Sequence, residues 1–488
     1  MPAQPPSSSW RRAVERLDSS RKRLLAFARE KPGLSALIAT ALLAVVAIGV
    51  VALYERVRRP PDITNEGATF NPTETKVKRK VRTVDWPLYG YNLRRTRYLA
   101  AKGIKPPFKR LWKYGGRPLL EFPPSYANGK LFGVDNNGHV FAIDADTGKV
   151  LWKRRAAGLN ASSPTYFRHR LFIVTLSPGQ VLALNERTGR TEWRKELGSR
   201  SESAPVAVGN RVFFGDEAGT LYAVDRRNGS TIWTAQLCGS IKAAPAYHHG
   251  ILYVGDYGGC MNAVNSHSGN IRWQSSSQGL GLGTVGRFYS TPAVAFGRVY
   301  SGNLDHRVYS FEAEDGELAW SHSTGGYVYS GPTVADTPTT APTVYIGSID
   351  GYLYALNAKN GETRWSHPVG GPIISSPSAV GNIVYASTYS PKQTDGLAMR
   401  TGHQVFSFGT GGANSPVISD GHRIYLTGYS SITALQPLTR RQLRKQAQAR
   451  KQRAKRKQAR RQHRRQERRA KAQRQQKAKG NGKAGGSG

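Results

Sequence analysis

Two cysteines, Cys238 and Cys260, are the residues whose chemistry depends most on where the fold places them, and the chain has no others. In an oxidising compartment the pair would close a disulfide. Two buried thiols without chemistry are the competing interpretation. A disulfide requires Cα atoms about 4.4–6.8 Å apart, and spacing along the chain does not give that distance, so both interpretations stay open.

Other segments that could do chemistry carry weaker patterns. Residues Gly281 to Gly286 read GLGTVG and match the letters of a dinucleotide-binding loop, but that loop needs a helix directly after it, and no helical pattern follows. The pair His248-His249 has no cysteine or carboxylate at metal-ligand spacing. No nucleophile elbow, acid–base dyad or phosphate loop is recognisable, and we predict no catalytic, cofactor-binding or metal-binding residue.

The elements that must position these residues follow from a repeat. Each copy has an apolar run, a polar turn closed by glycine and a second run that carries an aromatic residue, as in LYAVDRRNGSTIW. Glycine accepts the positive φ that such a turn requires. The copies end at Trp152, Trp193, Trp233, Trp273, Trp320, Trp365 and, with Phe in place of Trp, at Phe406. This pattern predicts repeated hairpins of short β-strands.

Prolines count the repeats independently. A small residue or proline followed by proline opens each unit, at Pro124, Pro164, Pro205, Pro245, Pro292, Pro332, Pro377 and Pro416. Proline cannot donate a ladder hydrogen bond and is normally confined to free strand edges. The innermost strand of a propeller has such an edge, facing the central channel. The eight prolines therefore predict an all-β fold, an eight-bladed β-propeller over residues 85–437.

The last blade lacks an outer strand of its own, because eight proline-marked strands are followed by only seven aromatic-bearing ones. The segment FKRLWKY places Trp112 one repeat length before Trp152. We expect this N-terminal strand to complete the eighth blade, which would remove the exposed edges that an open array keeps.

The repeat A-x-D/N-x-x-x-G-x-x-x-W resembles the tryptophan-docking motif of pyrroloquinoline-quinone-type (PQQ-type) propellers, and the segment DWPLYGYNLRRTRY, from Asp85 to Tyr98, looks like the one that often precedes it. The resemblance covers about residues 85 to 437. It implies that the tryptophans, Trp112 included, and Phe406 dock neighbouring blades rather than bind a ligand. A large ring whose N–H finds a backbone partner suits that role.

The same family includes quinoprotein dehydrogenases and proteins without a cofactor, among them the lipoprotein propellers of outer-membrane barrel assembly, so the fold alone does not give the function. The alcohol dehydrogenases of the family carry two adjacent cysteines over the quinone and a calcium ion near a catalytic Asp. Cys238 and Cys260 are not adjacent. We therefore expect a non-catalytic member without a cofactor, and PQQ with calcium is the alternative.

Two insertions mark a candidate binding face. Residues 275–289 and 389–395 are longer than the matching connections of the other repeats, and the strand order of a four-stranded meander places both on the face that carries the cysteines. Loops on a rigid scaffold commonly bind partners; tolerated drift in loop length is the competing interpretation. The candidate residues are Gly281, Gly283, Arg287, Tyr389 and Lys392.

An uncharged stretch, Leu34 to Tyr54, is long enough to cross a hydrocarbon core of about 30 Å, and we predict a retained signal-anchor helix there. A cleaved signal peptide is the alternative. The basic residues 1–33 favour a cytoplasmic N-terminus and an extracytoplasmic propeller under the positive-inside rule, although Arg56, Arg58 and Arg59 follow the span directly. Residues 55–84 are predicted to be a linker.

Half of the net charge of +40 lies in residues 438–488, where 21 Lys and Arg accompany a single acid, Glu467. The segment has no apolar stripe for packing, so we expect a disordered or helical tail. Residues 440–479 are predicted to bind a polyanion in a salt-dependent way. That polyanion would be anionic lipid or an envelope polymer outside the cytoplasm and nucleic acid inside it.

These patterns together favour a monomeric, membrane-anchored, extracytoplasmic propeller that acts as a binding scaffold for protein or anionic envelope polymer. Two alternatives of other classes stay open. One is a quinone-dependent oxidoreductase, and the other is a cytoplasm-facing propeller whose tail binds nucleic acid.

Overall fold

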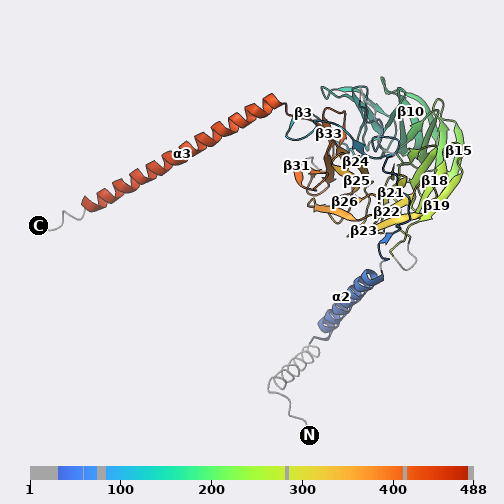
Figure 1. Cartoon of the computed structure of the whole chain (residues 1–488), viewed down its shortest axis with the longest axis horizontal. Coiled ribbons are helices and arrows are strands. Elements are labelled where there is room, and N and C mark those ends of the chain that lie inside the picture. The colour runs from blue at the N-terminus through green and yellow to red at the C-terminus, as the bar shows by residue number, and fades with distance from the viewer. Residues whose placement is uncertain (1–30, 59, 74–83, 281–284, 410–414, 482–488) are drawn as a thin grey trace, which may run out of the picture. The chain divides into compact units, whose positions relative to one another are not determined.

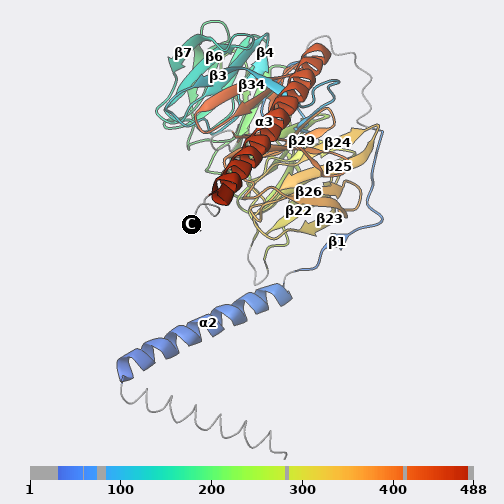
Figure 2. The ribbon, with the colours of Figure 1, turned by 90° about the vertical axis from the view of Figure 1, so that its left-hand side faces the viewer.

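The computed structural model describes residues 31–58, 60–73, 84–280, 285–409 and 415–481. The predictions for residues 1–30 and for Gly281 and Gly283 lie outside these ranges. Eight antiparallel sheets make up residues 108–437, one for each predicted blade (Figures 1 and 2).

Each blade runs from an inner strand a through strands b and c to an outer strand d. The strands of blades one to four are β4 (Ser125–Ala127), β5 (Lys130–Val134), β6 (His139–Asp144), β7 (Val150–Arg155); β8 (Thr165–Phe167), β9 (Arg170–Leu176), β10 (Gly179–Asn185), β11 (Thr191–Glu196); β12 (Val206–Val208), β13 (Arg211–Gly215), β14 (Thr220–Asp225), β15 (Thr231–Gln236); and β16 (Ala246–His248), β17 (Ile251–Gly255), β18 (Cys260–Asn265), β19 (Ile271–Ser276).

The strands of blades five to eight are β20 (Ala293–Ala295), β21 (Arg298–Gly302), β22 (Arg307–Glu312), β23 (Leu318–Ser323); β24 (Thr333–Thr337), β25 (Thr340–Gly347), β26 (Tyr352–Asn357), β27 (Thr363–Pro368); β28 (Ser378–Val380), β29 (Ile383–Thr388), β30 (Gln393–Ala398), β31 (Gln404–Gly409); and β32 (Ile418–Ser419), β33 (Ile424–Thr427), β34 (Ser431–Pro437), β3 (Phe108–Gly115). Inner strands of most successive blades contact one another, and β32 of the last blade contacts β4 of the first, which closes the ring. The eight-bladed propeller is confirmed.

The N-terminal strand β3 completes the last blade, as predicted. It pairs antiparallel with β34, with Phe108 opposite Pro437 and Trp112 opposite Ala434; Figure 2 shows the two strands side by side. Blade eight is thus assembled from both ends of the propeller sequence, which closes the ring.

Each tryptophan of the repeat docks its blade onto the next. The indole N–H donates to a backbone carbonyl in the turn between strands c and d of the following blade, at 3.0–3.1 Å. The ring also covers the turn glycine: a Cβ at Gly269, for example, would lie 2.8 Å from the ring of Trp233. The glycine is required both for its positive φ and for this close approach.

The segment before β3, residues 84–105, crosses the central channel and is called here the crossing segment. Within it β2 (Tyr98–Leu99) pairs parallel with β28. Its Arg95 and Arg97 are both 0 % exposed. Their guanidinium groups donate to carbonyl oxygens of four blades, those of Ala204, Pro205, Pro245, Thr291 and Pro332. These hydrogen bonds offset most of the cost of burying two guanidinium groups, although Nε of Arg97 has no partner among the described residues.

Part of the predicted linker is bound to blade five. Strand β1 (Ile63–Thr64) pairs with β23 and makes a fifth strand in that sheet. Asp62 accepts a hydrogen bond from the buried Arg307 at 3.1 Å and from the hydroxyl of Ser323 at 2.6 Å. Farther along, Thr69 donates twice to Glu312, each at 2.7 Å. Residues 62–71, called here the strap, therefore belong to the propeller.

Two helices are described besides the sheets. Helix α2 (Pro32–Arg58) is, among the residues described, the one helix long and apolar enough to span a membrane, a test that a signal sequence also passes. Helix α3 (Arg440–Asn481) occupies most of the basic tail. Thr439 and Gln442 form its capping box, because each side chain accepts the backbone N–H of the other, at 3.3 and 2.9 Å.

Candidate binding face

The two faces of the ring are built from different connections. The turns between strands a and b and between c and d form one face, called here the turn face. The turns between b and c, together with the connections from one blade to the next, form the other, called here the loop face. Cys238 and Cys260, Arg287, and the turn holding Tyr389 and Lys392 all belong to the loop face by this strand order.

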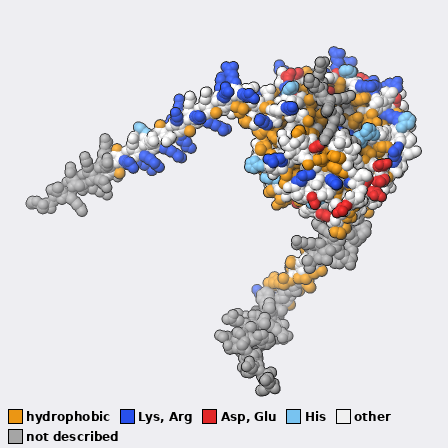
Figure 3. Space-filling model, viewed as in Figure 1, with side chains coloured by type: hydrophobic (Ala, Val, Ile, Leu, Met, Phe, Trp, Pro, Cys, Tyr) orange, Lys and Arg blue, Asp and Glu red, His pale blue; other side chains and the backbone are white. Residues whose placement is uncertain are grey.

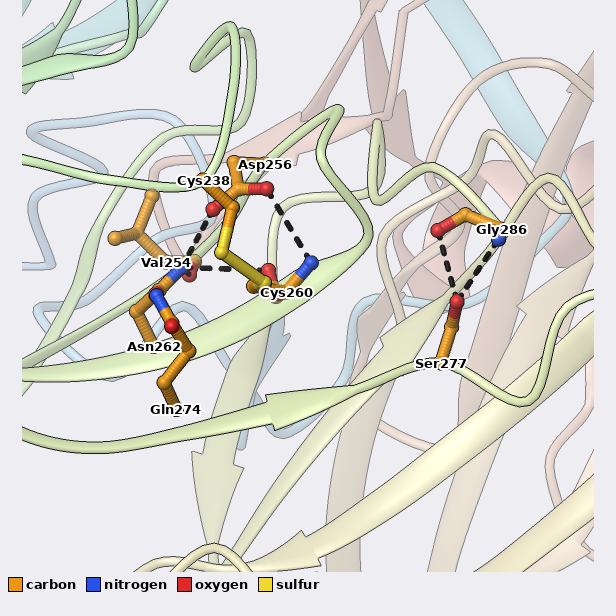
Figure 4. The surroundings of a disulfide bond; sticks show 8 residues. All are labelled: Cys238, Val254, Asp256, Cys260, Asn262, Gln274, Ser277 and Gly286. Carbon is orange, nitrogen blue, oxygen red and sulfur yellow. Dashed lines mark hydrogen bonds between the residues drawn. A yellow bond between two sulfur atoms is a disulfide. The ribbon is translucent and has the colours of Figure 1, made fainter. Parts of the chain in front are cut away.

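Cys238 and Cys260 form a disulfide, with Cα atoms 6.3 Å apart. This distance lies within the usual range for the bond. The bridge joins the connection that follows blade three to the b–c turn of blade four (Figure 4). It therefore fastens two neighbouring blades together on the loop face.

The side chain of Asp256 stabilises the turn that leads to Cys260 (Figure 4). Its carboxylate accepts the backbone N–H of Cys260 at 3.3 Å and the side-chain amide of Asn262 at 2.9 Å. Burial raises the pKa of this carboxyl, and these hydrogen bonds oppose the rise. Asp256 and the two sulfur atoms lie close enough together to hold a metal ion, but sulfurs bonded to each other are not thiolate ligands. The cluster is a structural staple.

The stapled turn presents Tyr257 beside the channel. The backbone N–H of Tyr257 donates a hydrogen bond to the carbonyl oxygen of Ser240, at 2.9 Å. Two cations lie over its ring, Lys242 with Nζ 5.8 Å from the centroid and Arg287 at 5.6 Å. Of the sequence-predicted loop residues that the structure describes, Arg287 is the one that contacts this group.

The channel opens on the loop face as a small cavity of about 80 Å³, called here the mouth. Aromatic and charged side chains alternate around it with small residues. The lining residues are Tyr89, Glu121, Phe122, Glu202, Ala204, Lys242, Ala244, Tyr289, Thr291, Tyr329, Ile374 and Ser375. Tyr89 comes from the crossing segment, so this segment forms the floor of the mouth.

Lys242 is the centre of an ion-pair network at one side of the mouth. Its ammonium lies 2.8 Å from Glu202 and 3.1 Å from Glu217. Glu217 also accepts from Arg200 at 2.5 Å. These pairs hold blades three and four in register and neutralise two of the three carboxylates in this region.

Glu121, on the other side of the mouth, is held differently. Its carboxylate accepts a long hydrogen bond from the Asn136 amide, at 3.4 Å, and no Lys, Arg or His of the described chain forms an ion pair with it. Burial raises the pKa of the Glu121 carboxyl; the hydrogen bond from Asn136 and the charge of Lys242 oppose the rise, and the charge of Glu202 adds to it.

Sequence reasoning missed these lining residues, although a signal for them exists. Glu121, Glu202, Lys242, Tyr289 and Tyr329 each stand three positions before the proline of their blade. A position fixed relative to the inner strand recurs around the channel, so reading it across all repeats recovers the mouth. The predicted Tyr389 and Lys392 are exposed on the b–c turn of blade seven and do not line the mouth.

A larger hollow of about 1100 Å³ lies on the turn face, beside the crossing segment. Its walls include Tyr91 and Tyr98 of that segment, and Tyr126, Tyr166 and Asp420 of the blades. None of the residues predicted from the sequence as a site lines it.

Comparison with known proteins decides the family. The model of the family described as outer membrane protein assembly factor BamB matches residues 106–244, 217–335 and 329–469. The chain belongs to this family. Among solved structures, BamB from Moraxella catarrhalis is 18% identical, with a TM-score of 0.57 over 68% of this chain and 100% of that one.

Proteins with other activities share the BamB-like fold. A quinohemoprotein alcohol dehydrogenase from Pseudomonas putida HK5 is 12% identical, with a TM-score of 0.62 over 72% of this chain and 80% of that one. A curated tetrathionate hydrolase from Acidithiobacillus ferrooxidans is 38% identical over 65 residues, which is 13% of each chain. The matched segment is thus a small part of that relative, and the structural likenesses show the fold alone.

The mouth does not fit a quinone cofactor. Pockets for small molecules have volumes of about 300–1,000 Å³, whereas the mouth has about 80 Å³. PQQ is a tricyclic tricarboxylate, and here it would meet the carboxylates of Glu121 and Glu202 beside a lysine that is already paired twice.

Proposed function

We propose that this BamB-like chain is a monomeric, membrane-anchored, extracytoplasmic scaffold whose loop face receives a protein partner. The observation that carries the proposal is the difference between the two faces. The turn face carries the crossing segment and the hollow beside it, whereas the loop face presents a stapled turn and a mouth lined by charged and aromatic side chains. A rigid surface with specific charged and aromatic groups suits recognition of a partner.

Membrane anchoring rests on helix α2, which has the length and composition of a span. The disulfide supports an oxidising compartment, because such bonds are rare in the cytoplasm. A cytoplasmic N-terminus with the propeller outside is consistent with both. The assembly role in the family's name is part of this proposal for the present chain.

Photocross-linking in intact cells tests the scaffold role. A photoreactive amino acid is placed at Arg287 or Tyr389 on the loop face, and at the exposed Glu314 in a c–d turn of the turn face as the matched control. We expect a discrete adduct of defined mass from the loop-face positions alone. Adducts of equal yield from Glu314, or none from either loop position, would reject the proposal.

A topology reporter tests the compartment. Fusion of a reporter that is active only outside the cytoplasm to the C-terminus should give active enzyme, and the Cys238–Cys260 bond should be present in protein isolated under thiol-blocking conditions. A reporter active only in the cytoplasm would support the alternative in which the tail meets nucleic acid.

The quinone-dependent alternative is tested on the purified full chain. PQQ and Ca²⁺ are added, unbound cofactor is removed, and the absorption spectrum is recorded. The mouth is too small for the ring system, so we expect no quinone to bind there, and the hollow of about 1100 Å³ on the turn face is the place that a retained quinone band would point to. A stoichiometric band would favour an oxidoreductase over the scaffold.

We also propose that the tail binds an anionic polymer or lipid surface. Helix α3 carries Lys and Arg along its length (Figure 3), and among its described residues the single acid, Glu467, pairs only with His463, at 3.3 Å. Truncation after Pro437 should abolish binding to polyphosphate, a soluble anion that the apolar helix α2 does not bind. The logarithm of affinity of the intact chain should fall linearly with the logarithm of salt concentration; binding that survives truncation would contradict this.

A further inference from the structure

The mouth contains one carboxylate that is placed as if for a cation. Glu202 and Glu217 share Lys242, and Glu217 also has Arg200. Glu121 lines the same cavity, and in the part of the chain that the structure describes no cation lies within ion-pair distance of it, although the charge of Lys242 acts on it from farther away. Desolvation makes an unpaired carboxylate costly, so a cation arriving in the mouth would remove a penalty that the isolated propeller bears.

The walls of the mouth favour a cation by their shape as well. Tyr289 and Tyr329 meet edge to face with ring centroids 5.5 Å apart, and Tyr89 and Phe122 do so at 6.3 Å. All four rings line the cavity that holds Glu121. Aromatic walls combined with a carboxylate are a recurring way to bind an ammonium group, because the ring faces carry negative potential.

The size of the mouth selects the head of the ligand. A volume of about 80 Å³ is room for a few water molecules at about 30 Å³ each. This volume admits an ammonium group with its first methylene groups. It excludes larger flat groups, such as a guanidinium stacked on a second planar group or a polycyclic ring. Ile374, which is 40% exposed, and Phe122 offer apolar surface to the alkyl stem.

We propose that the mouth is a binding site for a primary ammonium group, contributed by a lysine side chain of a partner protein that docks on the loop face. This inference rests on the proposed scaffold function and specifies the chemistry of its partner. Glu121 provides the charge, the tyrosines provide the walls, and the disulfide keeps Tyr257 and Lys242 on the opposite side in place.

The competing reading is that Glu121 is simply protonated and has no ligand. The two readings differ in a measurable way, because only the first makes affinity for an alkylammonium depend on this carboxylate. The probe is n-butylammonium chloride, with n-butanol as the neutral analogue of the same length. Binding to the full chain in detergent is followed by ligand-observed NMR at pH 7.

The variant is Glu121→Gln. The substitution keeps the shape of the side chain and an oxygen that can accept the hydrogen bond from Asn136. The matched control is Glu314→Gln, which removes one exposed carboxylate from the turn face. We expect saturable butylammonium binding in the native chain, at least fivefold weaker binding in Glu121→Gln and a change of less than twofold in Glu314→Gln. Thermal melting of each variant verifies that the fold is kept.

Three results would overturn the inference: equal binding of butylammonium and butanol, unchanged affinity in Glu121→Gln, or the same loss in both variants. The cross-linking experiment separates this failure from failure of the scaffold role. If a loop-face adduct forms in cells but butylammonium does not bind to the purified chain, the scaffold role is supported and the lysine site is rejected. Butylammonium binding without any loop-face adduct rejects the protein partner.

Discussion

The indole N–H of Trp365 donates to the carbonyl oxygen of Met399 at 3.0 Å, and Met399 lies in the last c–d turn of the ring. The next aromatic residue of the series, Phe406, faces blade eight, whose d strand β3 comes from the N-terminal side. Blade eight therefore has no c–d turn to supply an acceptor. Phe406 instead meets Phe108 edge to face at 5.2 Å, which explains the departure from Trp.

Trp365→Phe and Phe406→Trp should consequently differ in their effects. Trp365→Phe removes a partly buried hydrogen bond, while the Met399 carbonyl keeps the hydrogen bond from the Tyr345 hydroxyl at 3.0 Å, so the free energy of unfolding should fall by about 1 kcal/mol. Phe406→Trp restores the family residue but finds no carbonyl, so it should not stabilise the fold. Urea denaturation of both variants measures this; stabilisation by Phe406→Trp would show that the ring alone determines docking.

Gly269→Ala tests whether the turn glycines are needed for more than backbone conformation. Gly269 has φ +81°, and a Cβ there would meet Trp233 at 2.8 Å; Gly250, in the same blade, has φ +83° with open space around its Cβ position. Gly250→Ala should cost about 1–2 kcal/mol, the penalty of the left-handed conformation. Gly269→Ala should cost more, because the indole must also move. Equal losses would mean that the contact with Trp233 contributes nothing.

The ring, its closure by β3 and the placement of the cysteines on one face could be predicted because they depend on repeated local patterns. The path of the crossing segment could not be predicted, because arginines such as Arg95 and Arg97 usually lie at the surface of a protein. Their burial depends on carbonyl oxygens contributed by four blades, which no local pattern indicates. The strap could not be predicted either. Strand β1 is only two residues long, and the ion pair between Asp62 and Arg307 joins residues far apart in the sequence.

The mouth was missed for a different reason. Its lining residues differ in chemistry from blade to blade, from Glu121 to Lys242 to Tyr289, so no residue type recurs to attract attention. What recurs is the position before the proline, which is geometric. The sequence therefore predicts where a channel site would be once the inner strands are known, but not that Glu121 forms no ion pair with the other residues that the structure describes.

Asp62→Asn tests how firmly the strap is bound. Arg307 is 2% exposed and Asp62 46% exposed in their pair. Loss of the carboxylate weakens the compensation of a buried guanidinium, and we expect a loss of about 1–3 kcal/mol in the free energy of unfolding. The control is Asp146→Asn, whose partner Arg423 is near the surface and whose own side chain is 78% exposed. That pair should contribute under about 1 kcal/mol.

Limited proteolysis gives a second measurement of the strap. Asp62→Asn should speed cleavage within residues 62–71 while the blades stay resistant, because β1 is held by only two register pairs. Unchanged cleavage together with unchanged stability would show that the backbone pairing with β23 suffices.

The disulfide should stabilise the loop face. The bond closes a loop with a sequence separation of 22, for which chain entropy suggests a contribution of about 3 kcal/mol. Cys238→Ser with Cys260→Ser should lower the free energy of unfolding by up to that amount and increase hydrogen exchange around Tyr257. Exchange at blade seven, on the other side of the ring, serves as the internal control. Equal changes in both places would mean that the bond acts on the whole propeller.

The stability of the chain should depend on pH through Glu121. Burial raises the pKa of this carboxyl above its ordinary value of 4.5, so the folded chain holds the proton more tightly than the unfolded chain does. Stability should therefore fall as pH rises from the ordinary pKa through the raised one. Glu121→Gln, which cannot ionise, should match the native chain near pH 4 and exceed its free energy of unfolding at pH 7, by under about 1 kcal/mol for a partly exposed group.

Denaturation at the two pH values, with and without butylammonium, measures this difference. Because a bound cation favours the ionised carboxylate, saturating butylammonium should raise the stability of the native chain at pH 7 and leave Glu121→Gln unchanged. A native chain that is more stable than Glu121→Gln at pH 7 in the absence of any amine would show that Glu121 already has a favourable partner, and the mouth would then have no charge left to offer a lysine.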